Sequence, residues 1–75
     1  MDRLSQNARV LEYLAENPGA TARDIFDSCR VNSPRKRISE LRATHRIDDV
    51  WDESVDELGI RTRYKRYFLM GVVLQ

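Results

Sequence analysis

The first apolar pattern of the chain has the spacing of a helix. Apolar side chains recur every three or four positions as far as residue 15, which places them on one helix face. They are Leu4, Ala8, Val10, Leu11, Leu14 and Ala15. Ser5 is a suitable N-cap for this pattern, and the Asn-Pro-Gly run at 17–19 breaks it. The pattern therefore predicts a first helix between Ser5 and Asn17.

A second helix is predicted to be short and well delimited. Thr21 followed by Asp24 resembles a capping box, although Glu or Gln is the usual residue at the second position. The apolar residues that follow recur at i, i+3, i+4 and i+7. They are Ala22, Ile25, Phe26 and Cys29.

A third helical pattern follows a turn at residues 30–32. Ser33 is placed to cap this helix, and Pro34 takes its first position, where a missing N–H is harmless. The residues that would form its narrow buried stripe are Ile38, Leu41 and His45. The helical pattern continues as far as Arg46.

Beyond Arg46 the period changes from helical to alternating. Ile47, Trp51 and Val55 are separated by even numbers of residues, so they would share one face of a strand. The turn residues at 56–59 separate this run from a second β-rich run at 60–69, and the two would pair as an antiparallel hairpin. The apolar tail MGVVLQ could extend the second strand or contact a partner subunit.

The order of the elements predicts an α+β fold, with three helices followed by a two-stranded antiparallel hairpin. This is the element order of a winged helix-turn-helix. A chain of 75 residues is expected to form a single domain over 1–75. The helix-turn-helix would span about 21–46, and the wing hairpin about 47–69.

Two segments resemble the small winged-helix proteins encoded by phages and prophages. They are TARDIFDSCRVNSPRKRISELRATHRI, with its Arg-Ile-Ser-acid-Leu-Arg run, and RYKRYFL, with its Arg-Tyr-aromatic run. The resemblance covers most of residues 5–70. It implies a DNA-binding fold, in a regulator of transcription or an accessory factor in recombination or replication.

Composition limits the classes of function. No apolar run approaches the ~20 residues that cross a bilayer, and MDRLSQNARV lacks the apolar stretch of a signal peptide, so we expect a cytoplasmic protein without a membrane partner. One cysteine and one histidine cannot supply the four ligands of a structural zinc site, and Cys29 is predicted to be a small core residue. No phosphate-binding glycine loop or nucleophile–base pair is present, so neither an enzyme nor a cofactor is expected.

The net charge is only +1, but its distribution is uneven. Residues 34–46 carry five basic side chains and one acidic, residues 47–57 carry six acidic and none basic, and residues 58–75 carry four basic and none acidic. Two cationic segments are therefore separated by an anionic one.

The first cationic segment opens the third predicted helix. Arg35, Lys36 and Arg37 would oppose the positive end of the helix dipole, which costs up to ~1 kcal/mol each. The same arrangement is favourable if this helix end enters the major groove of double-stranded DNA. We expect Arg37, on another side of the helix, to pair within the fold or hold a phosphate. The residues predicted to contact DNA are Ser33, Arg35, Lys36, Ser39, Glu40, Ala43 and Arg46, with Arg61 and Arg63 on the hairpin.

The second cationic segment has two interpretations. A wing commonly touches the minor groove or the DNA backbone. Cross-strand ion pairs with the acidic strand would instead neutralise much of its charge, and Arg61 and Arg63, nearest the turn, are expected to stay free. The acids concerned are Asp48, Asp49, Asp52 and Glu53. The aromatic residues Trp51, Tyr64, Tyr67 and Phe68 are predicted to pack in the hairpin and core rather than to stack on bases.

An alternative function belongs to another class. The anionic segment at 47–57 would repel phosphate on a DNA-facing surface and could dock on a basic protein partner. A homodimer is a further expectation, because one small domain makes few DNA contacts. The candidate dimer segments are the first helix and the MGVVLQ tail.

Overall fold

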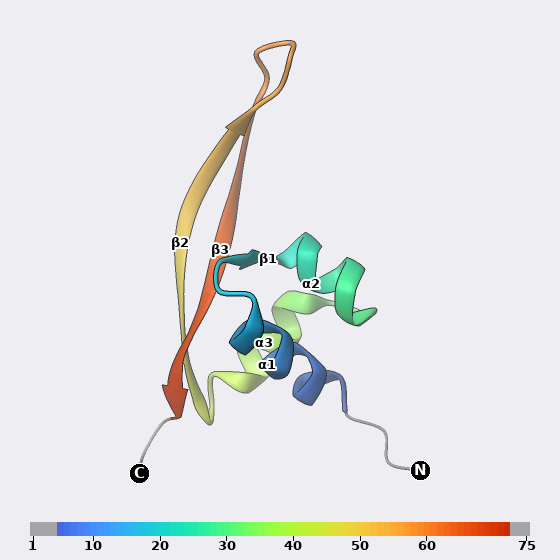
Figure 1. Ribbon diagram of the computed structural model, residues 1–75, viewed down its shortest axis with the longest axis vertical. Helices are drawn as coiled ribbons and strands as arrows, with labels where there is room; N and C mark the ends of the chain where they lie inside the picture. The colour runs from blue at the N-terminus through green and yellow to red at the C-terminus, as the bar shows by residue number, and fades with distance from the viewer. Residues whose placement is uncertain (1–4, 73–75) are drawn as a thin grey trace.

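In the described part of the chain, three short helices pack against a three-stranded antiparallel sheet (Figure 1). The computed structural model describes residues 5–72, so Leu4 and residues 73–75 of the tail lie outside the described part. The elements are α1 (Gln6–Glu16), β1 (Ala20–Thr21), α2 (Ala22–Cys29), α3 (Pro34–Leu41), β2 (His45–Val55) and β3 (Arg61–Val72). The order of helices and hairpin is the one predicted, with one additional strand.

The first two helices begin where their caps were predicted. The Ser5 hydroxyl accepts a hydrogen bond from the Ala8 N–H at 3.1 Å. In the capping box of α2, the Thr21 hydroxyl accepts from the Asp24 N–H at 3.1 Å, and the Asp24 carboxylate accepts from the Thr21 N–H at 3.0 Å. Aspartate thus replaces the usual glutamate or glutamine.

The predicted side-chain cap of α3 is wrong. Ser33 has φ 55° and ψ 68°, in the left-handed region, and its side chain makes no capping hydrogen bond. A capping side chain needs an extended backbone to reach the next turn. The Ser33 carbonyl instead accepts from the N–H groups of Lys36 and Arg37, at 3.0 and 3.2 Å. Pro34 does occupy the start of the helix, as predicted.

The predicted end of α3 is also wrong, because the helix stops at Leu41 rather than near Arg46. The N–H groups of Ala43 and Thr44 bond to carbonyls only three residues back, at 3.2 and 3.0 Å, which tightens and ends the last turn. His45 and Arg46 consequently lie in β2, and His45 does not complete the buried stripe of the helix.

The sheet has the order β1-β3-β2, and the pattern of the sequence did not predict β1. This strand has two residues, too few for any periodicity, and it pairs with Tyr67 and Arg66 of β3. Gly19 precedes it with φ 86°, and a Cβ there would meet the Phe68 ring at 3.5 Å. β3 runs on to Val72, so residues 70–72 of the apolar tail extend the strand.

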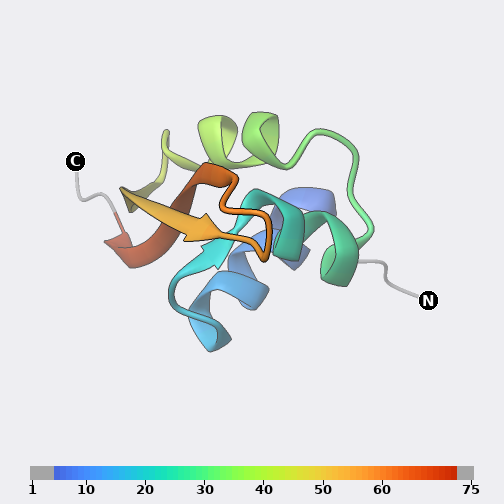
Figure 2. The same ribbon diagram turned by 90° about the horizontal axis from the view of Figure 1, so that it is seen from above.

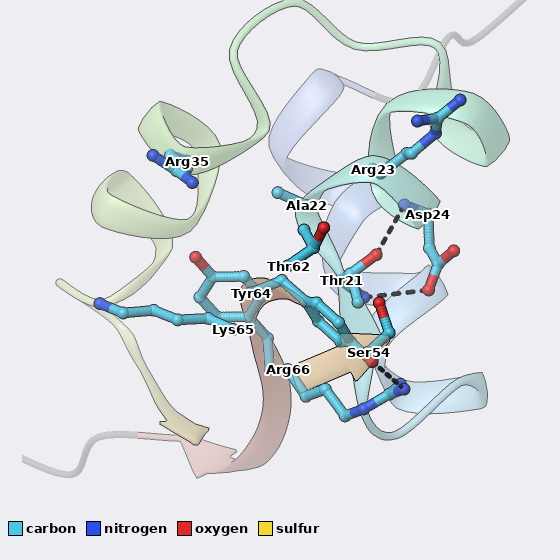
Figure 3. A pocket seen from close by; sticks show the side chains of 11 residues that line it. Thr21, Ala22, Arg23, Asp24, Arg35, Ser54, Thr62, Tyr64, Lys65 and Arg66 are labelled. Carbon is cyan, nitrogen blue, oxygen red and sulfur yellow. Dashed lines mark hydrogen bonds between the residues drawn. The ribbon is translucent and has the colours of Figure 1, made fainter. Parts of the chain in front are cut away.

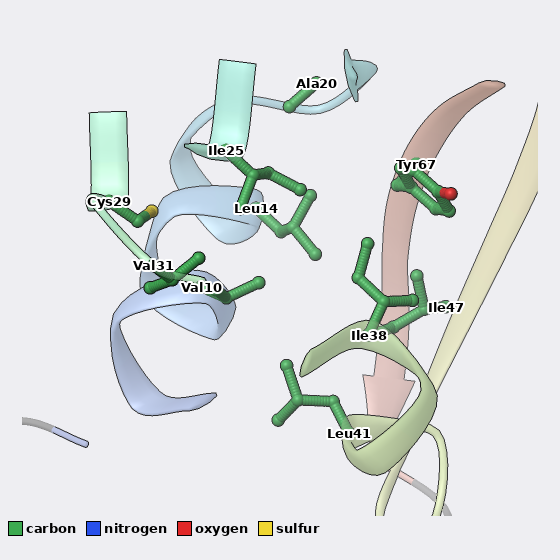
Figure 4. Close-up of a cluster of buried hydrophobic side chains, with 10 residues drawn as sticks. All are labelled: Val10, Leu14, Ala20, Ile25, Cys29, Val31, Ile38, Leu41, Ile47 and Tyr67. Atoms are coloured by element: carbon green, nitrogen blue, oxygen red, sulfur yellow. The ribbon is translucent and has the colours of Figure 1, made fainter. Parts of the chain in front are cut away.

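The core lies between the helices and the lower part of the sheet (Figure 4). Its buried side chains are Val10, Leu14, Ala20, Ile25, Cys29, Val31, Ile38, Leu41, Ile47 and Tyr67. Phe26, which was predicted to belong to the apolar stripe of α2, is 54% exposed. The side of α2 at Phe26 is therefore left uncovered by the other described elements.

The hairpin of β2 and β3 extends well past the helices. Figure 1 shows its upper part rising beyond them, and Figure 2 shows the hairpin from above, with α3 and α1 on opposite sides of it in that view. Every residue from 50 to 63 is exposed. Ile47 is buried, but Trp51 and Val55, further along the same strand, are 59% and 58% exposed. The alternation of apolar and polar residues in β2 therefore continues beyond the part of the strand that the helices cover.

Candidate nucleic-acid interface

A groove separates α3 from the hairpin. It encloses about 260 Å³, and both walls carry charged side chains. Its lining residues are Arg35, Ile38, Ser39 and Arg42 of α3 and Asp49, Trp51, Lys65 and Tyr67 of the strands. We refer to it as the α3–hairpin groove.

A second hollow, of about 490 Å³, lies between the start of α2 and the hairpin (Figure 3). The capping box of α2 forms part of its rim. Arg35 and Lys65 line both this hollow and the α3–hairpin groove. These two cations therefore stand where the concave surfaces meet.

The side of α3 that faces the hairpin differs from the predicted DNA face. Arg35, Ser39 and Arg42 line the groove at a spacing of i, i+4 and i+7, which is one stripe of a helix. The predicted contact residues of this helix included Lys36 and Glu40, which do not line the groove. Because the hairpin flanks α3, the concave surface lies along a flank of the helix instead. Sequence reasoning missed Arg42, although its spacing from Arg35 was a usable signal.

The other predicted residues of this segment are dispersed. Lys36 is exposed but does not line the groove, and Ser33 precedes the helix. Ala43 lies in the turn after α3, and Arg46 lies on β2, where it pairs with Asp48 at 3.3 Å. Neither Ala43 nor Arg46 lies on α3, because the helix ends earlier than predicted.

Glu40 connects α3 to α1. Its carboxylate accepts a hydrogen bond from the Asn7 side-chain amide at 3.0 Å and pairs with Arg37 at 3.4 Å. The Asn7 hydrogen bond is the main cause that lowers the pKa of Glu40, and the neighbouring cations lower it further. The prediction that Arg37 pairs within the fold is confirmed. Glu40, predicted to contact DNA, is thus engaged within the protein.

The basic side chains of β3 alternate between the two sides of the sheet. Because alternate residues of a strand share a side, Arg61 and Arg63 lie on the same side as Lys65. Tyr67 is next in this series and is buried in the core, so the three cations continue the side of β3 that carries Tyr67. Arg66 lies on the other side.

The acidic strand neutralises several of these cations, as predicted. Asp49 pairs with Lys65 at 3.2 Å, Asp52 with Arg66 at 2.7 Å, and Glu53 with Arg61 at 3.7 Å. The prediction that Arg61 stays free is therefore wrong, since Glu53, diagonal to it in the strand register, lies within reach. Arg63 has no carboxylate partner among residues 5–72 and lies over the Trp51 ring.

Asp49 joins both walls of the α3–hairpin groove. Its carboxylate pairs with Arg42 of α3 at 3.5 Å and with Lys65 of β3 at 3.2 Å. The hydrogen bond from Lys65 is the main cause that lowers the pKa of Asp49, and Arg42 contributes further. The carboxylate thus holds two cations at a set separation across the groove.

The comparison with protein families agrees with this geometry. The model of a winged helix-turn-helix domain matches residues 5–72. The chain belongs to the winged helix-turn-helix family. In this winged helix-turn-helix protein, α2 and α3 form the helix-turn-helix, and the β2–β3 hairpin is the wing. The predicted fold class is confirmed. No significant match was found among curated proteins or solved structures.

Membership of the family also bears on the class of activity. Winged helix-turn-helix domains are in general DNA-binding modules without catalytic activity. The concave surface between α3 and the wing is therefore the candidate nucleic-acid interface.

Within residues 5–72, no helix is long and apolar enough to span a bilayer.

Proposed function

We propose that the protein binds double-stranded DNA, with the start of α3 in the major groove and the wing along the adjacent backbone. The observation that carries this proposal is the convergence of Arg35 and Lys65, from α3 and β3, on both concave surfaces between helix and wing. A major groove about 12 Å wide admits an α-helix, and phosphates on its edges would meet the cations of the wing.

Each proposed contact has a chemical role. Arg35 and Lys36 can read guanine through O6 and N7, and the Ser39 hydroxyl can donate to a base or a phosphate. The positive end of the α3 dipole reinforces these contacts. The proposed contact residues are Ser33, Arg35, Lys36, Ser39 and Arg42 near or on α3, with Arg61, Arg63 and Lys65 on the wing.

The biological setting proposed for this binding is regulation of transcription, or an accessory role in recombination or replication, in a phage or prophage. The resemblance of the Arg-Ile-Ser-acid-Leu-Arg run supports this setting. A homodimer on paired half-sites is proposed as well, because a single domain of this size makes few base contacts.

A titration of random-sequence duplex DNA at two salt concentrations tests the proposal. We expect binding that weakens steeply with salt, and an Arg35→Ala variant that binds about tenfold more weakly than the wild type. Arg30→Ala is the matched control, because Arg30 is an exposed cation that lines neither concave surface of the interface. Equal losses in both variants, or no binding at low salt, would contradict the proposal.

A protein-binding role is the second candidate function. One observation favours it: the far end of the wing exposes Val55, Leu58 and Ile60, at 58%, 83% and 56%. The anionic segment at 47–57 supports this role less than its charge suggests. Its residues Asp49, Asp52 and Glu53 already pair with cations of the fold. Absence of DNA binding at low salt would favour this second function.

A further inference from the structure

Trp51 stands on the helix-facing side of the wing with two cations over its ring. The guanidinium carbon of Arg63 is 4.8 Å from the ring centroid, and the ammonium nitrogen of Lys65 is 5.2 Å from it. Lys65 is directly opposite Trp51 in the strand register, and Arg63 is diagonal to it. Both distances are within the range of a cation–π interaction.

The fold does not explain this tryptophan. It is the single tryptophan of the chain, it is 59% exposed, and it does not belong to the buried core. It does line the α3–hairpin groove, opposite Arg35 and Ser39. A large aromatic side chain at the wall of a proposed DNA-binding groove therefore has a role other than packing the interior.

Of the two cations over the ring, Arg63 is fully available to a ligand, whereas Lys65 shares its ammonium group with Asp49 at 3.2 Å. Arg63 has no carboxylate partner in the described part of the chain, because Glu53, its partner in the register, pairs with Arg61. Contact with a ring face uses the positive charge of a guanidinium but leaves its N–H groups free to donate. Both side chains have high conformational entropy when unrestrained, so the ring orders them before binding.

We propose that Trp51 is a positioning residue of the wing, which holds Arg63 and Lys65 toward α3 so that both meet the DNA phosphates. The inference rests on the proposed DNA-binding function and adds to it. Trp51 acts through the two cations, and their N–H groups make the contacts with phosphate oxygens.

The free protein provides a test that needs no DNA. In the wild type, the Arg63 side-chain protons next to the guanidinium should resonate upfield, because they lie over the aromatic ring. Trp51→Leu should abolish this ring-current shift and leave the amide signals of α1 and α2 unchanged, since Trp51 is outside the core and lines a groove with α3. Normal Arg63 shifts in the wild type would overturn the proposed stacking.

Duplex titrations then separate positioning from direct contact. We expect Trp51→Leu to weaken binding about two- to tenfold although it removes no charge, and Trp51→Phe to lose less. In an Arg63→Ala/Lys65→Ala background, Trp51→Leu should change affinity less than twofold, because the groups that it positions are gone. Val50→Ala, at an exposed position on the other side of the same strand, should bind as the wild type does.

The outcomes distinguish the two levels of the proposal. A Trp51→Leu variant that binds as tightly as the wild type overturns the role of Trp51 alone, and so does a full effect in the background without the two cations. A wild type that binds no duplex at low salt overturns the proposed function, and the role of Trp51 in DNA binding with it.

Discussion

Lys36 illustrates how function and stability compete at single residues of α3. It sits in the first turn of a helix that has no acidic residue there, and its side chain is exposed. A cation in this position opposes the helix dipole. Its placement becomes more favourable when an anion, such as a DNA phosphate, approaches the helix end.

We predict that Lys36→Ala leaves stability unchanged or raises the free energy of unfolding by a few tenths of a kcal/mol. DNA affinity should fall in the same variant, and the slope of log Kd against log salt concentration should decrease by about one. Urea denaturation and duplex titration of one preparation measure both effects. A variant that is clearly destabilised would show a structural role for Lys36 instead.

Asp52 gives a prediction for pH. The Arg66 guanidinium, 2.7 Å from its carboxylate, holds the pKa of Asp52 below its usual range, and the Glu53 N–H lowers it further. The folded pKa is thus below the unfolded value. The pair therefore stabilises the fold at neutral pH, and this stabilisation is lost as the pH falls through the folded pKa.

Arg66→Gln should raise the pKa of Asp52 toward the usual aspartate value, as measured by an NMR titration of the side-chain carboxyl. Asp49, which pairs with Lys65 and Arg42 rather than with Arg66, is the control, and its lowered pKa should be the same in both proteins. An unchanged pKa for Asp52 would mean that the Glu53 N–H, rather than Arg66, dominates its environment.

The turn between α2 and α3 carries backbone strain. Arg30 ends α2 in the left-handed region, at φ 52°, and its N–H donates to the Phe26 carbonyl at 3.1 Å. Glycine is the residue that adopts this C-terminal conformation without steric cost. The turn then places Val31 in the core, at 1% exposure, which fixes α3 relative to α2.

We predict that Arg30→Gly raises the free energy of unfolding by about 0.5–1 kcal/mol. Arg30→Ala, which keeps a Cβ in the strained conformation, should give no such increase. Thermal and urea denaturation of the two variants make the comparison. Equal stabilities of the two variants would contradict the prediction. Any change from the wild type would then come from loss of the arginine side chain and not from relief of backbone strain.

At the level of elements, local signals predicted the starts of helices better than their ends. Ser5 and the Thr21–Asp24 box act through side chains within one turn, so the sequence is sufficient to find them. The end of α3 depends on where Ile47 must join the sheet, which is a tertiary constraint. β1 depends likewise on pairing with a strand about 45 residues away, which no local pattern reports.

The relation between α3 and the wing could not be predicted at the level of the whole molecule. The sequence identified the basic residues of both elements, but a helical wheel cannot show that the hairpin flanks α3 and brings Arg42 to the groove. The ion pairs of the acidic strand were predictable from the opposite charges of the two strands, but their partners were not. Asp49, Asp52 and Glu53 each pair with a cation diagonal to them in the register rather than directly opposite.

A shortened wing tests whether the local contacts of the wing or the net charge of the chain governs DNA affinity. Joining Asp52 to Tyr64 through an Asn-Gly turn removes residues 53–63, all of them exposed, so the variant should fold and unfold cooperatively. The deletion removes three acids and two arginines, and the chain becomes more positive by one charge. We nevertheless predict duplex binding about tenfold weaker, because Arg61 and Arg63 are lost. Equal or tighter binding would show that net charge alone governs affinity.

NMR mapping of the backbone amides during titration with duplex DNA tests the central claim most directly. We predict that the perturbed amides cluster on α3 over 34–42 and on β3 over 61–67, with the Trp51 indole N–H among the signals that shift. Perturbations centred on α1 and the C-terminal half of α2, with α3 and β3 unaffected, would contradict the proposed interface.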